Sequence, residues 1–521
     1  MTIPAATPPV PSRRAHAWRV LRLAWLSGLA GCAVGPDFHP AVHPAVTGFT
    51  PKPLPVATVS APARNGAAEI LQPGGRIAYD WWTMFHSPPL DRLVRRALAH
   101  SPTIEAARAT LRGARFDVYA QLGFFYPTVN AEYNFQRQQL AGNLNSNAPG
   151  VQGNGRVILP QITPGVPPYN EPVTYNLHTA QLTVGYTPDV FGSNTRQVES
   201  LRAQMRYQRF ELEAASLTLA SNVVAAAIQE ASLRDQIDAA RLAVTSNQAA
   251  LDVVQRRFAT GYASRVDVAQ QQSLLASAEA AVPPLEKQLE QTRDLLRSLT
   301  GDLQDKDEPE TFTLASLELP KTLPLSVPSD LVEQRPDIRA AQEQWHEATA
   351  NVGVAVAARL PAVNLTANAG GVAAEFDQMF SHGGPFWSIA ADFTQPLFDG
   401  FTLYNKERSA RAAMRTAAAQ YRATVVTAYQ NVADSLQAIL ADGRAYATAV
   451  AAEDAARVGL QAARDQEAHG YADVLALITA ETAYDQAVEL RIQAEAARLG
   501  DAAALYVALG GGWWNRPEEK G

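Results

Sequence analysis

The chain has 521 residues, of which 47% are hydrophobic and only 18% are charged. Its 44 basic and 51 acidic residues give a net charge of −7, which disfavours binding to nucleic acid through phosphate neutralisation. The single cysteine excludes an internal disulfide framework and a cysteine-cluster metal site, and the absence of an uninterrupted apolar run of about 18 residues argues against a membrane-spanning helix.

The N-terminus has the features of a targeting signal. Four arginines between residues 13 and 22 precede a short apolar stretch at 23–31 that is too short to span a bilayer. The stretch ends in Leu29-Ala30-Gly31-Cys32, which resembles a bacterial lipobox. Residues 1–31 are therefore predicted to be a lipoprotein signal peptide, and Cys32 to carry a diacylglycerol and an N-acyl lipid. A free buried cysteine is the alternative.

The residues after Cys32 are predicted to be a lipid-anchored tether over 32–88. Residues 34–75 are rich in Pro, Ala and Val and show no sustained period, which is typical of an extended segment. In lipoproteins of this kind an Asp directly after the cysteine favours retention in the inner membrane. Ala33 stands there, so the outer membrane is the predicted location.

The rest of the chain reads as an internal duplication. Ser101–Ala107 resembles Arg335–Ala341 at an offset of 234, and Gly261-Tyr262-Ala263 matches Gly470-Tyr471-Ala472 at an offset of 209. The change in offset places extra residues in the first half, in an Asn/Gly/Pro-rich exposed loop at about 141–172. We predict a first repeat at 89–300, a linker or equatorial segment at 301–328, a second repeat at 329–512 and a tail at 513–521.

Each repeat contains one helix followed by two predicted strands, at about 124–137 and 174–188 in the first and 360–372 and 386–397 in the second. In the first strand, apolar side chains from Phe125 to Phe135 alternate with polar ones from Tyr126 to Gln136. A period of two is typical of a strand with one apolar and one polar face. A soluble sheet packed on a core is one interpretation. Aromatic residues at the strand ends favour a lipid-facing sheet with a wet interior.

Two long helices complete each repeat, at 194–260 and 264–300 and at 402–468 and 473–508. Residues 194–258 contain no proline and carry an apolar seven-residue row from Val198 to Leu233. About 65 helical residues extend roughly 100 Å, which indicates a coiled-coil-like array. Gly261 and Gly470 are placed to supply the tight reversal between the helices of each pair.

Four strands are too few to close a membrane barrel. An open sheet in lipid leaves unpaired backbone groups on both edges, at a cost of several kcal/mol for each group, whereas a closed bacterial barrel needs about eight or more strands. Strands that span a membrane therefore require several copies of the chain. Dimers, trimers and tetramers remain open at this point.

Several motifs together resemble the TolC-like outer-membrane efflux factors, and most closely their OprM/NodT-type lipoprotein branch. They are the lipobox followed by Val34-Gly35-Pro36-Asp37-Phe38, the duplicated order of elements, and the segments Asp189-Val190-Phe191-Gly192 and Pro396-Leu397-Phe398-Asp399-Gly400. The resemblance covers essentially the whole mature chain. It implies an α+β membrane protein in which a homotrimer forms a 12-stranded transmembrane barrel continuous with a long α-helical periplasmic barrel.

The resemblance also implies the function. The expected protein is the outer-membrane channel of a tripartite efflux system, a passive conduit for drugs or other small molecules that works with a periplasmic membrane-fusion adaptor and an inner-membrane RND-type pump. A duct for type I protein secretion is the alternative within the same fold. A lipid-tethered coiled-coil scaffold without a pore is the alternative from another class.

The two helix turns are the expected functional tips. By resemblance, Gly261, Ser264 and Asp267 face the adaptor at the first turn, and Gly470 and Tyr471 do so at the second. Ser264 and Asp267 are equally suited to cap the following helix, and the two roles are compatible.

A gate is expected beside the second turn. Leu475 falls at the family position of the constricting ring at the closed periplasmic end, where three leucines would hinder water and ions by dewetting; ordinary packing between helices is the alternative. Thr479 stands where the family often has Asp, so charge at the gate is in doubt, and Asp473 is the nearby candidate to supply it.

No pattern in the sequence predicts catalysis, a cofactor or a metal. His39 and His43 lie in the predicted tether, where no helix brings them together. The acidic cluster Asp302, Asp305, Asp307 and Glu308 lacks the spacing of a calcium loop. We therefore predict that the protein is not an enzyme.

Overall fold

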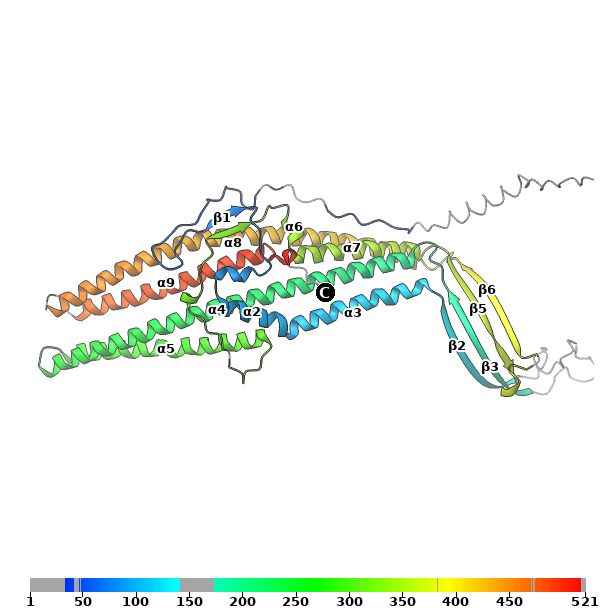
Figure 1. The fold of residues 1–521 in the computed structure, drawn as a ribbon, viewed down its shortest axis with the longest axis horizontal. Helices are drawn as coiled ribbons and strands as arrows, with labels where there is room; N and C mark the ends of the chain where they lie inside the picture. Colours follow the sequence, from blue (N-terminus) through cyan, green and yellow to red (C-terminus); the bar gives the residue numbers. More distant parts are fainter. Residues whose placement is uncertain are drawn as a thin grey trace, which may run out of the picture. The chain divides into compact units, whose positions relative to one another are not determined.

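The computed structural model describes residues 33–41, 46, 48–140, 173–307, 309–381, 383–469, 471 and 474–516. Cys32, the loop at 141–172, Gly470 and Asp473 lie outside these ranges, so the predictions that concern them stay predictions. The chain forms two compact units (Figure 1). The first takes in residues 33–38, 115–202 and 346–415, and the second takes in 39–114, 203–345 and 416–516.

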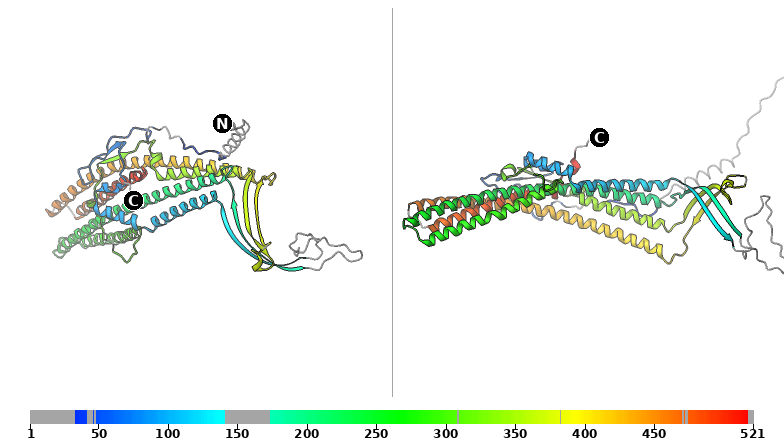
Figure 2. Two further views of the ribbon diagram at one scale, coloured as in Figure 1. Left: turned by 45° about the vertical axis from the view of Figure 1, so that its right-hand side comes forward. Right: turned by 90° about the horizontal axis from the view of Figure 1, so that it is seen from below.

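The first unit contains a four-stranded antiparallel sheet, whose strands run side by side in both views of Figure 2. The strand order is β2-β3-β5-β6, so each repeat supplies two neighbouring strands. The strands are β2 (Thr128–Leu140), β3 (Val173–Tyr186), β5 (Ala362–Ala373) and β6 (Pro385–Thr394). The prediction that the first strand begins near 124 is wrong, because Gly123–Phe125 form a 3-10 turn and the strand begins only after Pro127.

Helices make up more than half of the described residues, in two sets that match the two repeats. The first set is α2 (Pro88–His100), α3 (Pro102–Leu122), α4 (Ser193–Ala259) and α5 (Arg265–Thr300). The second is α6 (Leu331–Gln334), α7 (Pro336–Ala357), α8 (Thr402–Ala468) and α9 (Val474–Ala508). The single helix expected at the start of each repeat is divided in both, because a proline at 102 and at 336 ends the preceding helix.

The two longest helices begin in the same way. Gly192 and Gly400 have positive φ values of 74° and 65°. Before α4, the Asp189 carboxylate accepts hydrogen bonds from the backbone N–H groups of Asn194 and Thr195, at 2.9 and 2.7 Å. Before α8, the Asp399 carboxylate accepts one from the N–H of Leu403 at 2.7 Å. The paired Asp-and-Gly segments in the sequence are therefore helix starts, which a carboxylate stabilises by satisfying free N–H groups.

The second unit is built around one hydrophobic core. Buried side chains of η1 (Trp81–Phe85), α2, α4, α8 and α9 pack together there, among them Trp81, Phe85, Val223, Leu436 and Leu505. One window of α4 is apolar enough to cross a membrane, with a mean hydropathy of 1.2 and 44% of it buried in the chain. Because Val223 in the middle of α4 belongs to this core, we interpret the window as core packing.

Residues 56–73, here called the strap, differ from the extended tether expected for 32–88. The strap folds back on itself, with the Thr58 N–H donating to Glu69 O at 3.0 Å. Its last four residues form β1 (Ile70–Pro73), which pairs in parallel with β4 (Thr322–Leu325) of the segment between the repeats. The sequence did not predict this pairing, because the partner strand lies some 250 residues away and leaves no local period.

The residues that follow Cys32 are docked on the first unit. The Val34 N–H donates to Phe191 O at 3.2 Å, and the guanidinium of Arg196 donates to Val34 O and to the Asp37 carboxylate at 3.1 and 2.7 Å. Phe38 stacks on the ring of His346, with centroids 4.3 Å apart. The motif Val34–Phe38 therefore attaches the N-terminal segment to α4 and α7.

Two glycines allow this docking. Gly35 has a φ of +99°, and a Cβ added to it would lie 2.4 Å from the Cα of Gly353 in α7. A Cβ at Gly353 would in turn lie 2.9 Å from Val34 O. The two backbones cross at a distance that no side chain permits.

We predict that Gly353→Ala lowers the thermal unfolding midpoint of the detergent-purified protein, by an overpacking cost of about 1–3 kcal/mol. Gly113→Ala in α3 is the matched control, because a Cβ there meets nothing within 4 Å. The control should gain about 0.5–1 kcal/mol from helix propensity. Equal shifts for both variants would contradict the crossing.

Candidate functional site

The strand register places one apolar face across the whole sheet. Val129 lies opposite Val184, which lies opposite Ala367, which lies opposite Ile389. The next row on the same face is Ala131, Leu182, Ala369 and Trp387. Within one chain this face is uncovered, with Trp387 and Ile389 76% and 78% exposed. Such a face requires an apolar environment outside the chain.

The opposite face of the sheet is polar. Its central row is Asn130, Thr183, Asn368 and Ser388, and the amide of Asn368 donates to Ser388 Oγ at 3.3 Å. The apolar face thus suits contact with lipid and the polar face suits contact with water, as the alternation in the sequence predicts. Among the described strands, β2 and β6 are the sheet edges, and each pairs on one side only.

The first helix turn has the predicted geometry. Gly261 has a φ of +83°, which supplies the left-handed residue at the end of α4. Ser264 and Asp267 form a capping box at the start of α5: the Asp267 N–H donates to Ser264 Oγ at 3.2 Å, and the Ser264 N–H donates to the Asp267 carboxylate at 2.7 Å. The hydrogen bond from the Ser264 backbone lowers the pKa of Asp267. The capping role is confirmed, and contact with an adaptor stays a prediction.

The second turn is described only in part. Tyr471 is 85% exposed. Leu475 is the second residue of α9 and is also exposed, at 59%. Thr479 donates its hydroxyl to Leu475 O at 2.8 Å, so this side chain is engaged with its own helix. These positions leave Leu475 free to meet another chain, and its role as a gate stays a prediction.

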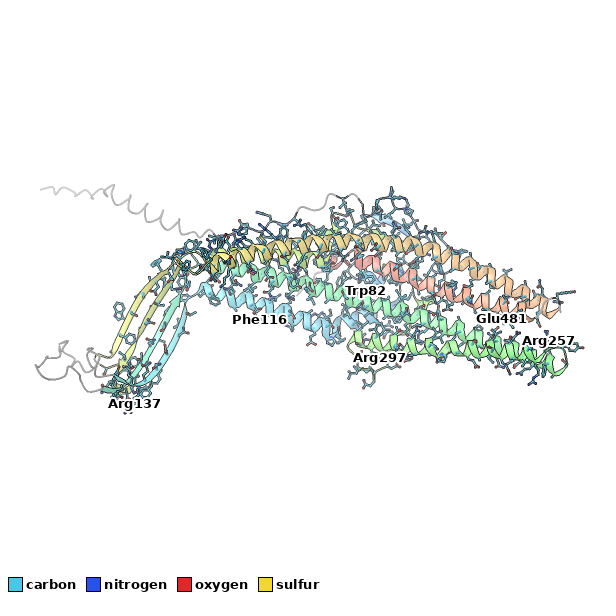
Figure 3. All side chains as sticks on the ribbon, turned by 180° about the vertical axis from the view of Figure 1, so that it is seen from behind. Trp82, Phe116, Arg137, Arg257, Arg297 and Glu481 are labelled. Atoms are coloured by element: carbon cyan, nitrogen blue, oxygen red, sulfur yellow. The ribbon has the colours of Figure 1, made fainter. Side chains whose placement is uncertain are left out.

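Ion pairs that the sequence analysis missed join the two helix pairs beside the turns. Arg257, near the end of α4, pairs with Glu467, near the end of α8. Arg464 of α8 donates to Ser246 Oγ of α4 at 3.1 Å and to Glu481 of α9 at 3.2 Å. Figure 3 labels Arg257 and Glu481 on these helices. The partners are up to 218 residues apart in sequence, and no local pattern marks them.

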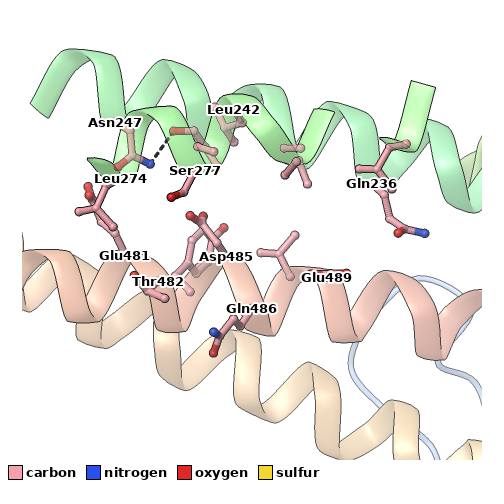
Figure 4. Close-up of a pocket in the computed structure, with 18 of the residues that line it drawn as sticks. Gln236, Leu242, Asn247, Leu274, Ser277, Glu481, Thr482, Asp485, Gln486 and Glu489 are labelled. Atoms are coloured by element: carbon pink, nitrogen blue, oxygen red, sulfur yellow. Dashed lines mark hydrogen bonds between the residues drawn. The ribbon is translucent and has the colours of Figure 1, made fainter. Parts of the chain in front are cut away.

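A cavity of about 790 Å³ lies between the pair α4–α5 and the pair α8–α9 (Figure 4). Leu242 and Leu274 line its α4–α5 side. Glu481, Asp485 and Glu489 line its α9 side at intervals of four residues, which places them on one helix face. The α4–α5 wall of the cavity is therefore mostly apolar, with Gln236, Asn247 and Ser277 as its polar members, and the α9 wall carries three acidic side chains.

The acidic wall carries a perturbed carboxyl group. Burial raises the pKa of Asp485 to about 6, and the negative charge of Glu481 adds to this effect, while Arg464 opposes it. Arg464 is bound to Glu481, and Arg491 is bound to Glu453 and Glu495. Negative charge at Asp485 is thus only partly compensated.

Among the described residues, no group of three or more His, Cys, Asp or Glu side chains is arranged to hold a metal ion. The acidic cluster after α5 is instead engaged in ion pairs on the surface. Asp302 pairs with Lys306 at 2.6 Å and Asp307 pairs with Arg293 at 3.1 Å. Both carboxyl groups are therefore engaged by side chains of the protein itself, so neither points to a bound metal ion.

Comparison with known proteins identifies the relatives of this chain. The family model described as outer membrane efflux protein matches residues 93–302 and 327–511, which correspond to the two repeats. Two curated relatives are described as pyoverdine export outer membrane proteins OpmQ. The one from Pseudomonas aeruginosa is 28% identical over 481 residues, covering 89% of this chain and 94% of its own. The one from Pseudomonas putida is 27% identical over 433 residues, covering 83% and 88%.

A solved structure extends the comparison to the fold. The outer-membrane channel OprN is 25% identical to this chain and covers 92% of it, and all of the OprN chain is matched, with a TM-score of 0.77. The duplicated arrangement of strands and long helices is therefore that of an outer-membrane channel.

The titration of Asp485 predicts a pH-dependent stability. Because its pKa is raised in the folded protein, the folded state binds the proton more tightly, and the free energy of unfolding falls as pH rises from about 4 to about 6. At pH 7.5, Asp485→Asn should stabilise the protein by about 1 kcal/mol after allowance for solvent screening. The thermal unfolding midpoint measures this difference.

The matched control for this prediction is Asp454→Asn, at an exposed α8 carboxylate that pairs with Arg457. It should leave the midpoint almost unchanged. At pH 4 the wild type and Asp485→Asn should unfold at the same temperature. A stabilisation that is the same at pH 4 and pH 7.5 would show that Asp485 titrates normally.

Proposed function

We infer the function of the protein from its family. This chain belongs to the outer membrane efflux protein family, whose model matches most of its length. The protein is the outer-membrane channel of an efflux system. The relatives and the solved neighbours are channel proteins. We propose that it is a passive conduit, in which the chain supplies a path and performs no chemistry.

We propose that three copies assemble into one channel. The observation that carries this proposal is the sheet of four strands with one uncovered apolar face and two open edges. Joining β6 of one copy to β2 of the next satisfies both edges and directs the polar rows toward a shared lumen. Three copies give 12 strands, the number that the resemblance to TolC-like channels implies.

We propose small organic molecules as the cargo. The curated relatives are named for the export of pyoverdine and, in another case, as part of a toluene efflux pump. These names favour small-molecule efflux over the alternative of a protein-secretion duct. The relatives do not support the other alternative, a scaffold without a pore.

The partners of the channel are proposed from the same resemblance. They are a periplasmic membrane-fusion adaptor, which would bind the turns at Gly261 and Tyr471, and an inner-membrane RND-type pump. Cys32 is proposed to carry the lipid that adds an anchor in the outer membrane. Docking of Val34 and Asp37 on Arg196 supports a fixed position for that anchor. Mass spectrometry of the mature N-terminus tests the acylation.

The purified full-length protein tests the proposed function. In mild detergent its mass should correspond to three chains, and in planar lipid bilayers it should open ion-conducting channels. A mass of one chain with no conductance would overturn the proposal. Co-purification of an adaptor from cell envelopes would identify the pump to which the channel belongs.

The gate predicts a specific mutant phenotype. Leu475→Ala removes the apolar side chain of the proposed ring, so single-channel conductance should rise severalfold because the constriction no longer dewets. Leu490→Ala on the same helix is the matched control, since Leu490 is 57% exposed, close to the 59% of Leu475. Unchanged conductance in Leu475→Ala, or an equal rise in the control, would argue against a gate at this level.

A further inference from the structure

The strands of the two repeats are equivalent at fixed offsets. The offset of 234 found in the sequence makes Val129 of β2 equivalent to Val363 of β5. In the sheet, Val129 lies opposite Val184 of β3, and Val363 lies opposite Phe393 of β6. Val184 and Phe393 are therefore equivalent as well, at an offset of 209. The same offset of 209 relates the two helix turns in the sequence, so strand pairing and sequence give one alignment of the repeats.

One strand pairing within the chain joins the two repeats. It is the pairing of β3, the second strand of its repeat, with β5, the first strand of the next repeat, and it sets Val184 opposite Ala367. The register continues one residue beyond the paired strands, where the Thr187 hydroxyl donates to Asn364 Oδ1 at 2.8 Å. A closed ring needs the same junction once more, between β6 of one copy and β2 of the next.

We propose that β6 pairs with β2 of the next copy in the register that β3 and β5 use within one chain. Phe393 is the equivalent of Val184, and the offset of 234 makes Tyr133 the equivalent of Ala367. Phe393 therefore lies opposite Tyr133 of the next copy. This assignment rests on the proposed assembly of three copies and deepens it, because it names the residues that meet at each boundary between chains.

Both faces of the sheet stay continuous across this boundary. A slip of one residue would carry the apolar side chains of β2 onto the polar face, because side chains alternate along a strand. In the proposed register Phe393 and Tyr133 meet on the apolar face, and Asp392 and Asn134 meet on the polar face. The equivalence of the repeats uses only backbone pairing and sequence offsets, so the agreement of the faces is independent support.

Charge on the polar face separates this register from one of its neighbours. A shift of two residues in one direction keeps both faces but sets Asp392 opposite Glu132, and like charges directly opposite each other destabilise a sheet. Glu132 already accepts a hydrogen bond from Gln181 of its own chain at 3.2 Å. In the proposed register the amide of Asn134 faces Asp392 instead, and an amide can donate to a carboxylate. A shift of two residues in the other direction sets Asp392 opposite Gln136, so charge allows it and only the equivalence of the repeats opposes it.

The two outer edges of the sheet expose positions that the inner strands cover. Phe393 on β6 and Tyr133 on β2 are exposed within one chain. Their equivalents Val184 and Ala367 are half-buried, because each lies on a strand that is paired on both sides. A strand of the next copy in the proposed register would cover Phe393 and Tyr133 in the same way. A neighbouring copy therefore accounts for the exposed aromatic side chains on both edges.

Disulfide formation between engineered cysteines tests the register in the full-length protein. Asp392→Cys combined with Asn134→Cys places the two thiols on opposite residues, where Cα atoms about 4.5–5.5 Å apart allow a disulfide. The matched controls combine Asp392→Cys with Glu132→Cys or with Gln136→Cys, which lie on the same face but about 7–8 Å away on the diagonal. After oxidation in detergent, the first pair should link at least about five times as many chains as either control on a non-reducing gel.

A second pair keeps both acidic side chains in place. Phe393→Cys combined with Tyr133→Cys lies on the apolar face and should link chains equally well, including where the first pair does not fold. Its controls replace the change at Tyr133 with Ala131→Cys or Phe135→Cys. The single-cysteine variants measure the background from Cys32.

The mass of the wild type and of each variant in mild detergent separates the possible failures. A mass of three chains with linking strongest in the opposite pairs supports the register. A mass of three chains with stronger linking in a shifted control, or with no linking above background in either pair, overturns the register and leaves the proposed channel intact. A wild-type mass of one chain overturns the assembly of three copies and the register with it.

Discussion

The two unpaired edges of the four-stranded sheet are the constraint on which the rest of this molecule depends. An apolar face across all four strands requires lipid, and lipid cannot satisfy the free N–H and C=O groups of β2 and β6. A single chain therefore has the apolar face that contacts lipid but cannot pair its own sheet edges. Neighbouring copies of the chain are needed to pair them. The duplication fits this logic, because each repeat contributes one strand pair to the sheet and one set of long helices.

Arginine links the helices of this acidic chain. Arg257 and Arg464 connect α8 with α4 near the turns, while Arg498 fastens the strap to α9. Carboxyl groups outnumber their basic partners at the cavity wall that contains Asp485, and the pKa of Asp485 is raised.

Local patterns in the sequence predicted much of this structure, but they did not predict the pairings between residues far apart in the chain. The alternation from Val129 to Phe135 predicted both faces of the sheet, and Gly261 predicted the first turn, since these signals depend on neighbouring residues only. The strap and its β1–β4 pairing were missed, because their geometry is fixed by residues far along the chain. The candidate tip at Ser264 and Asp267 was identified by resemblance to the family, whereas the pairing of Arg257 with Glu467 became visible only in the structure, where α4 and α8 end together.

The equal lengths of α4 and α8 carry an evolutionary consequence. Each has 67 residues, and the pairing of Arg257 with Glu467 shows that their ends lie at one level. An insertion of one turn in a single repeat would separate those ends by about 5 Å. Changes in length are then tolerated only when both repeats acquire them, so the two halves of the gene are expected to gain or lose codons in step.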